Sequence, residues 1–456
     1  MIRRDSSRGH RAYAWQAHNV VRWRVGRAST ALFVYSLIGG AIVLGAAPPA
    51  MAENGLNLIG FGAESILMGG ADVAVARDTS ALNSNPAGLT QIRSKVFDFK
   101  PGVAKALDVS HADALGNDKK VSNDVLWLAG AGYAQPMAVC RCTVGVGLFV
   151  QGGAGYEYKD LQTPFGNRDE FTSLLGIARL AAGGAWQATD DLSVGVSVSA
   201  LYSRLDQRLF PSTSFFNPVD PARSFAGLRL EKATGIRPGV RVGVQYRGIP
   251  DWTLGAVYAP RTALPLSDGT LEANFSSLGL GVVTYRDVRV EGFSQPEEAA
   301  FGAAWQANPA LLLSLKVQWL GWSKAVRATT LRASNPDNAF APPNITVPAA
   351  HDWRDQWVYA VGAAYRPFGR LTFYGGVNYG KNPIPAEHLS PILAAVLEWH
   401  VTTGFKWDLA KDWTLTAGVE YQVGNSVSYS NPQSIFGRST ERAKGIVVPV
   451  MLSVRW

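Results

Sequence analysis

Apolar and polar positions alternate along much of this chain, and the C-terminal end has the clearest pattern. Apolar side chains occupy every second position there, and the residues between them include Ser453 and Arg455; the apolar positions are Ile446, Val448, Val450, Leu452, Val454 and Trp456. A period of two predicts a β-strand with one apolar face. Such a strand, ending the chain on an aromatic residue, is typical of the last strand of an outer-membrane barrel, one of two backbone arrangements that can span lipid.

Segments with the same period recur and predict fourteen strands. Clear examples run from 413 to 421, from 192 to 200 and from 311 to 319. The predicted strands cover residues 94–104, 124–134, 142–152, 175–187, 192–205, 228–247, 252–265, 286–306, 310–323, 353–366, 371–381, 397–408, 412–425 and 445–456. An even number of strands of about 11 residues or more fits a bacterial barrel better than a soluble sandwich, whose strands have about five or six residues.

The predicted connections alternate between short and long. Short turns lie at 135–141, 188–191, 248–251, 307–309, 367–370 and 409–411, and long loops at 105–123, 153–174, 206–227, 266–285, 324–352, 382–396 and 426–444. This asymmetry is characteristic of outer-membrane barrels. Tryptophans beside the short turns fit a girdle at the headgroup level, although tryptophan also favours strands in general; they are Trp186, Trp252, Trp305, Trp407 and Trp413. We therefore predict an all-β fold, a 14-stranded antiparallel transmembrane β-barrel over residues 94–456.

The N-terminus has the composition of an export signal. Seven arginines and one acid precede residue 31, an apolar run covers 31–47, and Ala50-Met51-Ala52 offers a small-x-small cleavage site. A membrane anchor is the alternative, because 17 residues are near the lower limit of a span. We expect residues 1–52 to be a signal peptide.

Charge and cysteine content narrow the function classes. The chain of 456 residues has a net charge of +8, from 43 basic and 35 acidic residues. Removing residues 1–52 leaves 36 basic and 34 acidic residues, so the basic character belongs to the leader and nucleic-acid binding loses its support.

Cys140 and Cys142 form a C-x-C pair, which is too few ligands for a structural zinc site. Incidental thiols, or a pair oxidised together at a turn, are both compatible with this spacing.

Residues 53–93 do not follow the strand pattern, yet their content of Leu, Ile, Phe and Val argues against disorder. An ordered, partly apolar segment ahead of a barrel can fold inside the lumen as a plug. We therefore predict an N-terminal hatch (plug) inside the lumen, formed by residues 53–93. A flexible periplasmic extension is the alternative.

Two blocks of motifs resemble the FadL/TodX family of outer-membrane transporters for long-chain fatty acids and other hydrophobic compounds. The first block is Gly69-Gly70-Ala71, Asp78-Thr79-Ser80-Ala81 and the hatch motif Asn85-Pro86-Ala87-Gly88-Leu89. The second is Trp353-Arg354-Asp355, Val361-Gly362-Ala363-Ala364-Tyr365-Arg366, Asn382-Pro383-Ile384-Pro385, Ser390-Pro391 and Trp399-His400. The similarity covers essentially all of the chain after the leader. The long leader and the terminal Trp456, where phenylalanine is commoner, depart from the family pattern.

The resemblance implies a route for an apolar ligand. Such a ligand would be captured at the outer loops, pass to a pocket above the hatch, and leave sideways through the barrel wall. In the family the third strand carries an inward kink, and Gly152 and Gly153 are our candidates for it, because glycine inside a strand often marks a bulge. The alternative is that these glycines merely begin the next loop.

The candidate binding residues follow from the same resemblance. Loops 206–227 and 266–285 match the outer binding groove, and apolar clusters in loops mark binding sites or loops that pack on themselves. The capture candidates are Phe210, Phe215, Phe216, Phe275, Leu278, Leu280 and Val282, and the inner-pocket candidates are Leu56, Leu58, Ile59 and Phe61. Arg204 and Arg208 would hold a carboxylate headgroup; for a neutral hydrocarbon they are only solvated charges.

The sequence thus predicts uptake of long-chain fatty acids or hydrocarbons across the bacterial outer membrane by passive diffusion. A general diffusion porin for small hydrophilic solutes is the alternative, but a porin would lack a hatch. We expect no enzyme activity, because the few histidines lie in no nucleophile motif, and no cofactor or metal. Expected partners are a hydrophobic ligand, membrane lipid, lipopolysaccharide and, through the C-terminal strand, the barrel-assembly machinery, with no nucleic acid, and we expect a monomer.

Overall fold

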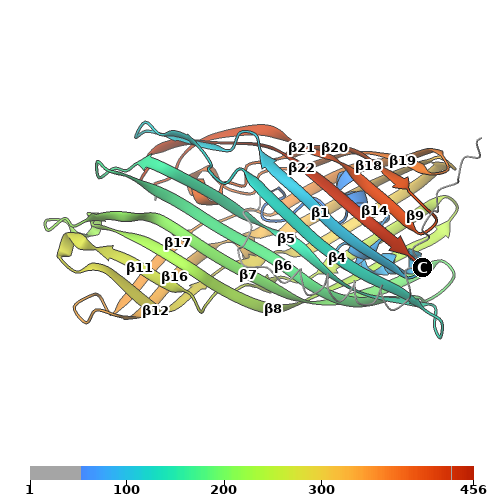
Figure 1. Cartoon of the computed structure of the whole chain (residues 1–456), viewed down its shortest axis with the longest axis horizontal. Helices are drawn as coiled ribbons and strands as arrows, with labels where there is room; N and C mark the ends of the chain where they lie inside the picture. The colour runs from blue at the N-terminus through green and yellow to red at the C-terminus, as the bar shows by residue number, and fades with distance from the viewer. Residues whose placement is uncertain (1–52, 433) are drawn as a thin grey trace, which may run out of the picture. The chain divides into compact units, whose positions relative to one another are not determined.

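The computed structural model describes residues 53–432 and 434–456, so the predicted signal peptide lies outside the described residues. Within the described residues, fourteen antiparallel strands close into a barrel, because β22 pairs with β1 as well as with β21 (Figure 1). The strands of the wall are β1 (Val96–Ala106), β4 (Val125–Met137), β5 (Cys142–Gln162), β6 (Arg168–Gln187), β7 (Leu192–Phe215), β8 (Phe225–Ile249), β9 (Trp252–Ala259), β14 (Glu297–Asn308), β15 (Leu311–Gly321), β18 (Gln356–Phe368), β19 (Leu371–Gly380), β20 (Trp399–Asp408), β21 (Trp413–Ser430) and β22 (Arg438–Arg455). The predicted 14-stranded barrel is confirmed.

Much of what the sequence predicts as long loops is additional strand. These strands are β2 (Ser110–Asp113), β3 (Asp118–Lys120), β10 (Thr262–Ala263), β11 (Thr270–Phe275), β12 (Gly281–Glu291), β13 (Ser294–Gln295), β16 (Ala328–Pro336) and β17 (Asn344–Ala350). Strands β11, β12, β16 and β17 continue the sheet from β8 beyond the barrel wall. The predicted strand 286–306 is divided among β12, β13 and β14, and the chain turns after β12 at Gly292 with φ +103°.

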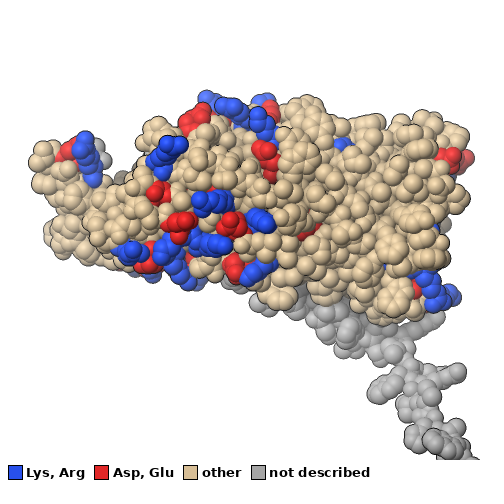
Figure 2. Space-filling model, turned by 90° about the horizontal axis from the view of Figure 1, so that it is seen from above, with Lys and Arg blue, Asp and Glu red and all other residues tan. Residues whose placement is uncertain are grey.

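The outer face of the wall has the chemistry of a surface in lipid. Its exposed side chains are valines, leucines and aromatic residues, and Trp186, Trp252 and Trp305 lie at the short-turn rim. A second aromatic belt, formed by Trp127, Trp357, Tyr359 and Trp399, marks the opposite boundary. Figure 2 shows Lys, Arg, Asp and Glu gathered on the half of the visible face that carries the long connections, and few of them over the other half. The two aromatic belts therefore delimit the part of the wall that faces lipid.

Residues 53–93, predicted as the plug, precede the first strand and are hydrogen-bonded to lumen-facing side chains of the barrel wall. They contain α2 (Ala63–Leu67), η1 (Thr79–Leu82) and η2 (Pro86–Gln91), and nearly all of their residues are buried. The η1 turn is capped by Asp78, which accepts from the Ser80 amide at 2.6 Å. The remaining short helices are η3 (Pro221–Arg223), η4 (Ser276–Leu278), α3 (Trp322–Ala325), η5 (Ala386–His388) and η6 (Pro391–Leu393). None of the helices in the described part of the chain has the length and apolar character needed to cross a bilayer.

Candidate functional site

The plug is held to the barrel wall by hydrogen bonds from lumen-facing side chains. Carbonyl groups of the plug accept from strands on several sides: Thr402 donates to Leu67, Asn378 to Gly69, Ser314 to Ala71 and Ser197 to Leu82, all at 2.8–2.9 Å. Donors from β7, β15, β19 and β20 surround the plug, so it blocks the axis of the barrel.

The hatch motif explains part of this fit. Asn85 donates to the Val73 carbonyl inside the plug at 2.8 Å and to the Val244 carbonyl of β8 at 3.1 Å. Its side-chain oxygen accepts from the Ala87 amide at 3.2 Å and caps η2. A Cβ on Gly88 would lie 2.0 Å from the Ala76 carbonyl oxygen, so the plug requires glycine there. The motif therefore joins two turns of the plug to each other and to the wall.

Ion pairs add to the attachment. Arg241 of β8 forms two hydrogen bonds to Glu298 of β14, both at 2.7 Å, and also donates to the Ser84 carbonyl of the plug at 3.3 Å. Lys316 of β15 lies 3.5 Å from Asp72 of the plug. All four charged side chains are buried. Removing one member of such a pair would leave its partner as an uncompensated buried charge.

The wall is interrupted between β4 and β5. These two strands pair over seven residues only, from Met137↔Cys142 to Ala131↔Leu148. Above Ala131, β4 continues to Val125 and pairs with β1, but residues 125–130 have no partner on β5. The connection before β4 meets β5 again higher up, where the Ser122 amide donates to the Glu157 carbonyl at 2.8 Å. The unpaired stretch between these two points is called the wall gap below.

A bulge in β5 accompanies the wall gap. The β5–β6 register shifts between Val150 and Gly152, and Gly152 and Gly153 have φ +147° and +142°. Here β5 turns to the plug: the Gly153 amide donates to the Leu56 carbonyl at 2.9 Å. A Cβ on Gly152 would lie 1.9 Å from that same oxygen, which restricts the position to glycine. The structure therefore places both glycines at a bulge against the plug, and their role in a lateral opening stays a prediction.

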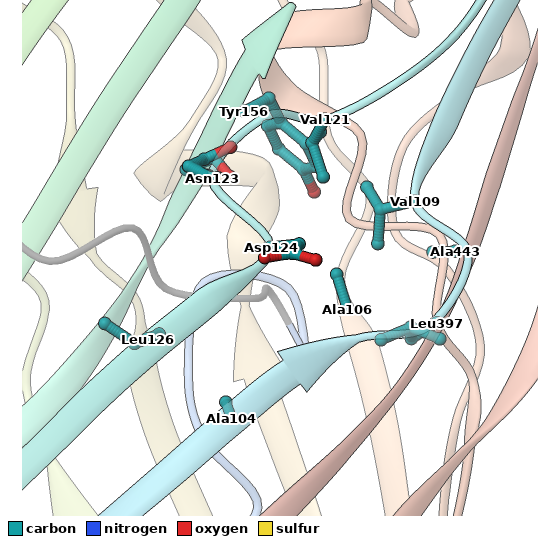
Figure 3. A pocket seen from close by; sticks show the side chains of 11 residues that line it. Ala104, Ala106, Val109, Val121, Asn123, Asp124, Leu126, Tyr156, Leu397 and Ala443 are labelled. Atoms are coloured by element: carbon teal, nitrogen blue, oxygen red, sulfur yellow. Dashed lines mark hydrogen bonds between the residues drawn. The ribbon is translucent and has the colours of Figure 1, made fainter.

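Two cavities lie along the wall gap. The upper cavity, of about 20 Å³, is shown in Figure 3; Leu126 of β4 lines it together with Tyr156 of β5 and Leu397 of the β19–β20 connection. The lower cavity, of about 60 Å³, is lined by Leu128 and Gly130 of β4, by the plug and by strands β1 and β22. By comparison, an apolar cavity of about 150 Å³ binds benzene. Neither cavity admits a ring in this conformation, so side chains must move for a substrate to pass.

The inner-pocket candidates take different positions. Phe61 and Leu58 line the lower cavity. Ile59 is buried and lines a polar cavity that Leu58 and Phe61 also line, and the Leu56 side chain belongs to the outer hydrophobic core. The structure therefore brings only two of the four side chains to the lower cavity.

The capture candidates divide into buried and exposed residues. Phe210, predicted in a loop, lies in β7, is fully buried and packs on Phe171 and Phe436 with ring centroids 5.0 and 5.6 Å apart. The exposed members are Phe215, Phe216, Leu278 and Val282, whereas Phe275 and Leu280 are half-buried against the outer core. Ser214 and Ser277 join the two tips that carry them through a hydrogen bond of 2.7 Å. The four exposed side chains are called the apolar tip below.

The two headgroup candidates are already paired. Arg204 makes a bidentate contact with Asp206, at 2.7 and 3.2 Å, and Arg208 lies 3.3 Å from Glu170. A ligand carboxylate would have to compete with these carboxylates. Periodicity alone could not reveal the pairing with Glu170, since that residue lies 38 positions earlier.

Sequence reasoning missed a buried cluster in the outer core. His111 of β2 lies 2.6 Å from Glu441 of β22 and 3.0 Å from Asp113. Burial disfavours the imidazolium, but the hydrogen bonds and charges of these two carboxylates outweigh it and raise the pKa of His111 to about 9. In the part of the chain that the structure describes, no group of His, Cys, Asp and Glu side chains has the arrangement of a metal site.

Known proteins share this architecture. The P. putida toluene transporter TodX superimposes with a TM-score of 0.72 at 22% identity, over 88% of this chain and 99% of that one. The Ralstonia pickettii toluene transporter TbuX gives 0.69 at 20% identity, and a Pseudomonas aeruginosa FadL homologue gives 0.68 at 17%, each over 88% of this chain and 99% of the other. At these identities the likeness establishes the fold.

Two further similarities concern the sequence. A Chlorobium limicola protein, described as an uncharacterized protein in the 5′ region of the phosphoenolpyruvate carboxykinase gene, is 50% identical over 62 residues, which span 14% of this chain and 30% of that protein. The family model described as outer membrane protein transport protein (OMPP1/FadL/TodX) matches residues 63–450. With a plugged barrel, a bulged β5 and a match over most of its length, this chain belongs to the OMPP1/FadL/TodX family of outer-membrane transport proteins, which transport hydrophobic compounds and are not enzymes.

Proposed function

We propose that this protein takes up compact, neutral hydrophobic molecules from the cell surface and releases them sideways into the outer membrane through the wall gap. The observation that carries the proposal is the end of the β4–β5 ladder at Ala131↔Leu148, while β4 itself continues to Val125. A strand edge without a partner is the place where the wall can open once the side chains around the two cavities move.

The plug supports the lateral direction. An apolar molecule gains roughly 0.8 kcal/mol for each CH₂ that leaves water, so a passage ending in hydrocarbon is favoured over one ending in the aqueous periplasm. Hydrogen bonds from four strands hold the plug across the lumen. The same bonds argue against a general porin, which needs a continuous aqueous path.

Charge at the outer surface supports a neutral substrate. Arg204 and Arg208, the two headgroup candidates, are in ion pairs with carboxylates of this chain. The apolar tip offers Phe215, Phe216, Leu278 and Val282 as contacts that need no ligand charge. The solved relatives described as toluene transporters and as monoaromatic hydrocarbon channels agree with this substrate class.

The test compares uptake of labelled toluene, oleate and sucrose by porin-deficient bacteria with complete lipopolysaccharide, because toluene crosses a bare bilayer unaided. We expect the protein to raise toluene uptake and to leave sucrose uptake unchanged. Gly152→Ala, whose Cβ clashes with the plug, should abolish the gain, whereas Gly369→Ala, with no atom near its Cβ, should not. Sucrose uptake without a gain for toluene would overturn the proposal, and a gain for oleate alone would replace hydrocarbon by fatty acid.

A further inference from the structure

The turn between β4 and β5 contains the only two cysteines of the sequence, and they are joined by a disulfide. Cys140 lies in the turn itself, and Cys142 is the first residue of β5 and pairs with Met137. The disulfide therefore lies in the turn at the foot of the seven-pair ladder whose upper end, Ala131↔Leu148, is the lower edge of the wall gap.

Stabilisation by loop closure does not account well for this bond. A disulfide stabilises a fold mainly by restricting the unfolded chain, and the effect grows with the length of the loop that is closed. Here the cysteines are two positions apart, the shortest spacing that encloses a residue. A hydrogen bond from the Gln187 amide to the Arg141 carbonyl, at 2.8 Å, already holds the turn against the next hairpin.

The exposure of this turn to solvent favours thiol–disulfide exchange at the Cys140–Cys142 bond. Val139, Cys140 and Arg141 are exposed, whereas Cys142 is half-buried at the start of the strand. The turn belongs to the short-turn rim, which faces the periplasm in barrels of this type. Thiol–disulfide exchange requires that a thiolate reach one sulfur, and exposed disulfides are the labile ones.

We propose that Cys140–Cys142 is a thiol–disulfide exchange site for a dithiol protein of the periplasm, and that its reduction loosens the β4–β5 hairpin below the wall gap. One thiolate of the donor attacks Sγ of Cys140, and Sγ of Cys142 leaves as a thiolate and takes up a proton. The second donor thiol then attacks the mixed disulfide and releases Cys140. The donor ends as a disulfide and this protein as a dithiol, so two electrons and two protons are transferred.

The first test needs no transport. The folded wild-type protein is incubated with reduced thioredoxin under conditions that reduce insulin, and new thiols are counted by maleimide mass shift. Two single-cysteine variants are then mixed with thioredoxin whose resolving cysteine is replaced by serine and whose remaining cysteine carries thionitrobenzoate. We expect two new thiols in the wild type, and Cys142→Ser, which keeps Cys140, to be captured at least ten times faster than Cys140→Ser. An intact wild-type disulfide, or equal capture of both variants, would overturn the exchange site.

The second test addresses the effect on transport and rests on the proposed lateral route. Toluene uptake is compared for the oxidised protein, the reduced protein and the Cys140→Ser/Cys142→Ser double variant, at equal amounts of folded barrel. We expect the reduced protein and the double variant to be at least twofold faster than the oxidised protein. Equal, nonzero rates in all three would refute the coupling to the wall gap, whereas no uptake by any of them would refute the lateral route and leave the thiol result standing.

Discussion

Arg241 and Glu298 form a bidentate ion pair inside the barrel, with both nitrogen–oxygen distances at 2.7 Å. Arg241 also donates to the Ser84 carbonyl, so a single side chain joins β8, β14 and the plug. Both side chains are buried, so each charge destabilises the fold unless the other charge is present to pair with it.

Replacing Arg241 by methionine should therefore destabilise the folded barrel by about 3–5 kcal/mol, because Glu298 would remain as a buried charge. The double variant Arg241→Met/Glu298→Leu should recover much of this loss. Samples are heated to a series of temperatures and then run on a gel that separates folded from unfolded barrel. The measurement is the temperature at which the folded band disappears. As a control, Arg366→Met breaks a pair with Asp408 at the exposed rim and should change stability by less than about 1 kcal/mol. Equal losses in the single and the double variant would contradict a charge-pairing role.

A second prediction concerns the attachment of the plug by Asn85. Asn85→Ala removes the bonds to the Val73 and Val244 carbonyls and the cap of η2, so the plug should be held less firmly. A buried carbonyl without a partner costs about 1–3 kcal/mol. We expect cells producing this variant to become sensitive to vancomycin, which is too large for an intact plugged barrel. Asn338→Ala, which removes a similar cap in an exposed outer turn, is the matched control and should have no effect.

The sequence predicts the wall of this barrel better than its outer half. Within the lipid, only one face of a strand is apolar and the period of two is plain, as in residues 446–456. Beyond the lipid, outward-facing positions of β5 and β7 carry charged residues such as Lys159 and Arg208, so the apolar alternation fades and the sequence pattern is that of a loop. Phe210 shows the consequence, since it looks like an exposed loop aromatic and is a core residue.

The candidate site likewise has features that the sequence predicts and features that it does not. Glycines at 152 and 153 are visible in the sequence, because glycine is the residue that a bulge with positive φ requires. The partners of the bulge are not, because Leu56 lies almost a hundred positions away and contacts it through a backbone carbonyl. Leu397 in the upper cavity and Glu441 beside His111 have no local signal either, since both are brought there by closure of the barrel.

The paired arginines allow the substrate class to be tested directly. Arg204→Gln and Arg208→Gln should each leave toluene uptake within about twofold of wild type, because a neutral ring makes no use of the charge. Each variant leaves an acid, Asp206 or Glu170, without its partner, but these side chains are partly exposed and the loss of stability should stay below about 1 kcal/mol. A fall in oleate uptake of tenfold or more with unchanged toluene uptake would show instead that the arginines bind a carboxylate.

The protonation of His111 leads to a prediction about the stability of the outer core at alkaline pH. Its pKa in the folded state is about 9, against about 6.5 for a free imidazole, so protonation stabilises the fold. The full contribution, of order 3 kcal/mol, is present below about pH 6.5 and is lost as the pH rises through about 9. The outer core should therefore become more sensitive to trypsin between pH 7 and pH 9.5, with cleavage monitored at the connections beside β2 and β22.

The His111→Gln variant should lack this dependence and should be cleaved at a similar rate at both pH values, after correction for the pH profile of trypsin. His351 provides the matched control, because burial and the charge of His388 lower its pKa to about 4 and keep it neutral over this range. His351→Gln should therefore behave as wild type. An alkaline loss that persists in His111→Gln would assign the effect to another group, and the cluster of His111, Asp113 and Glu441 would then have no part in it.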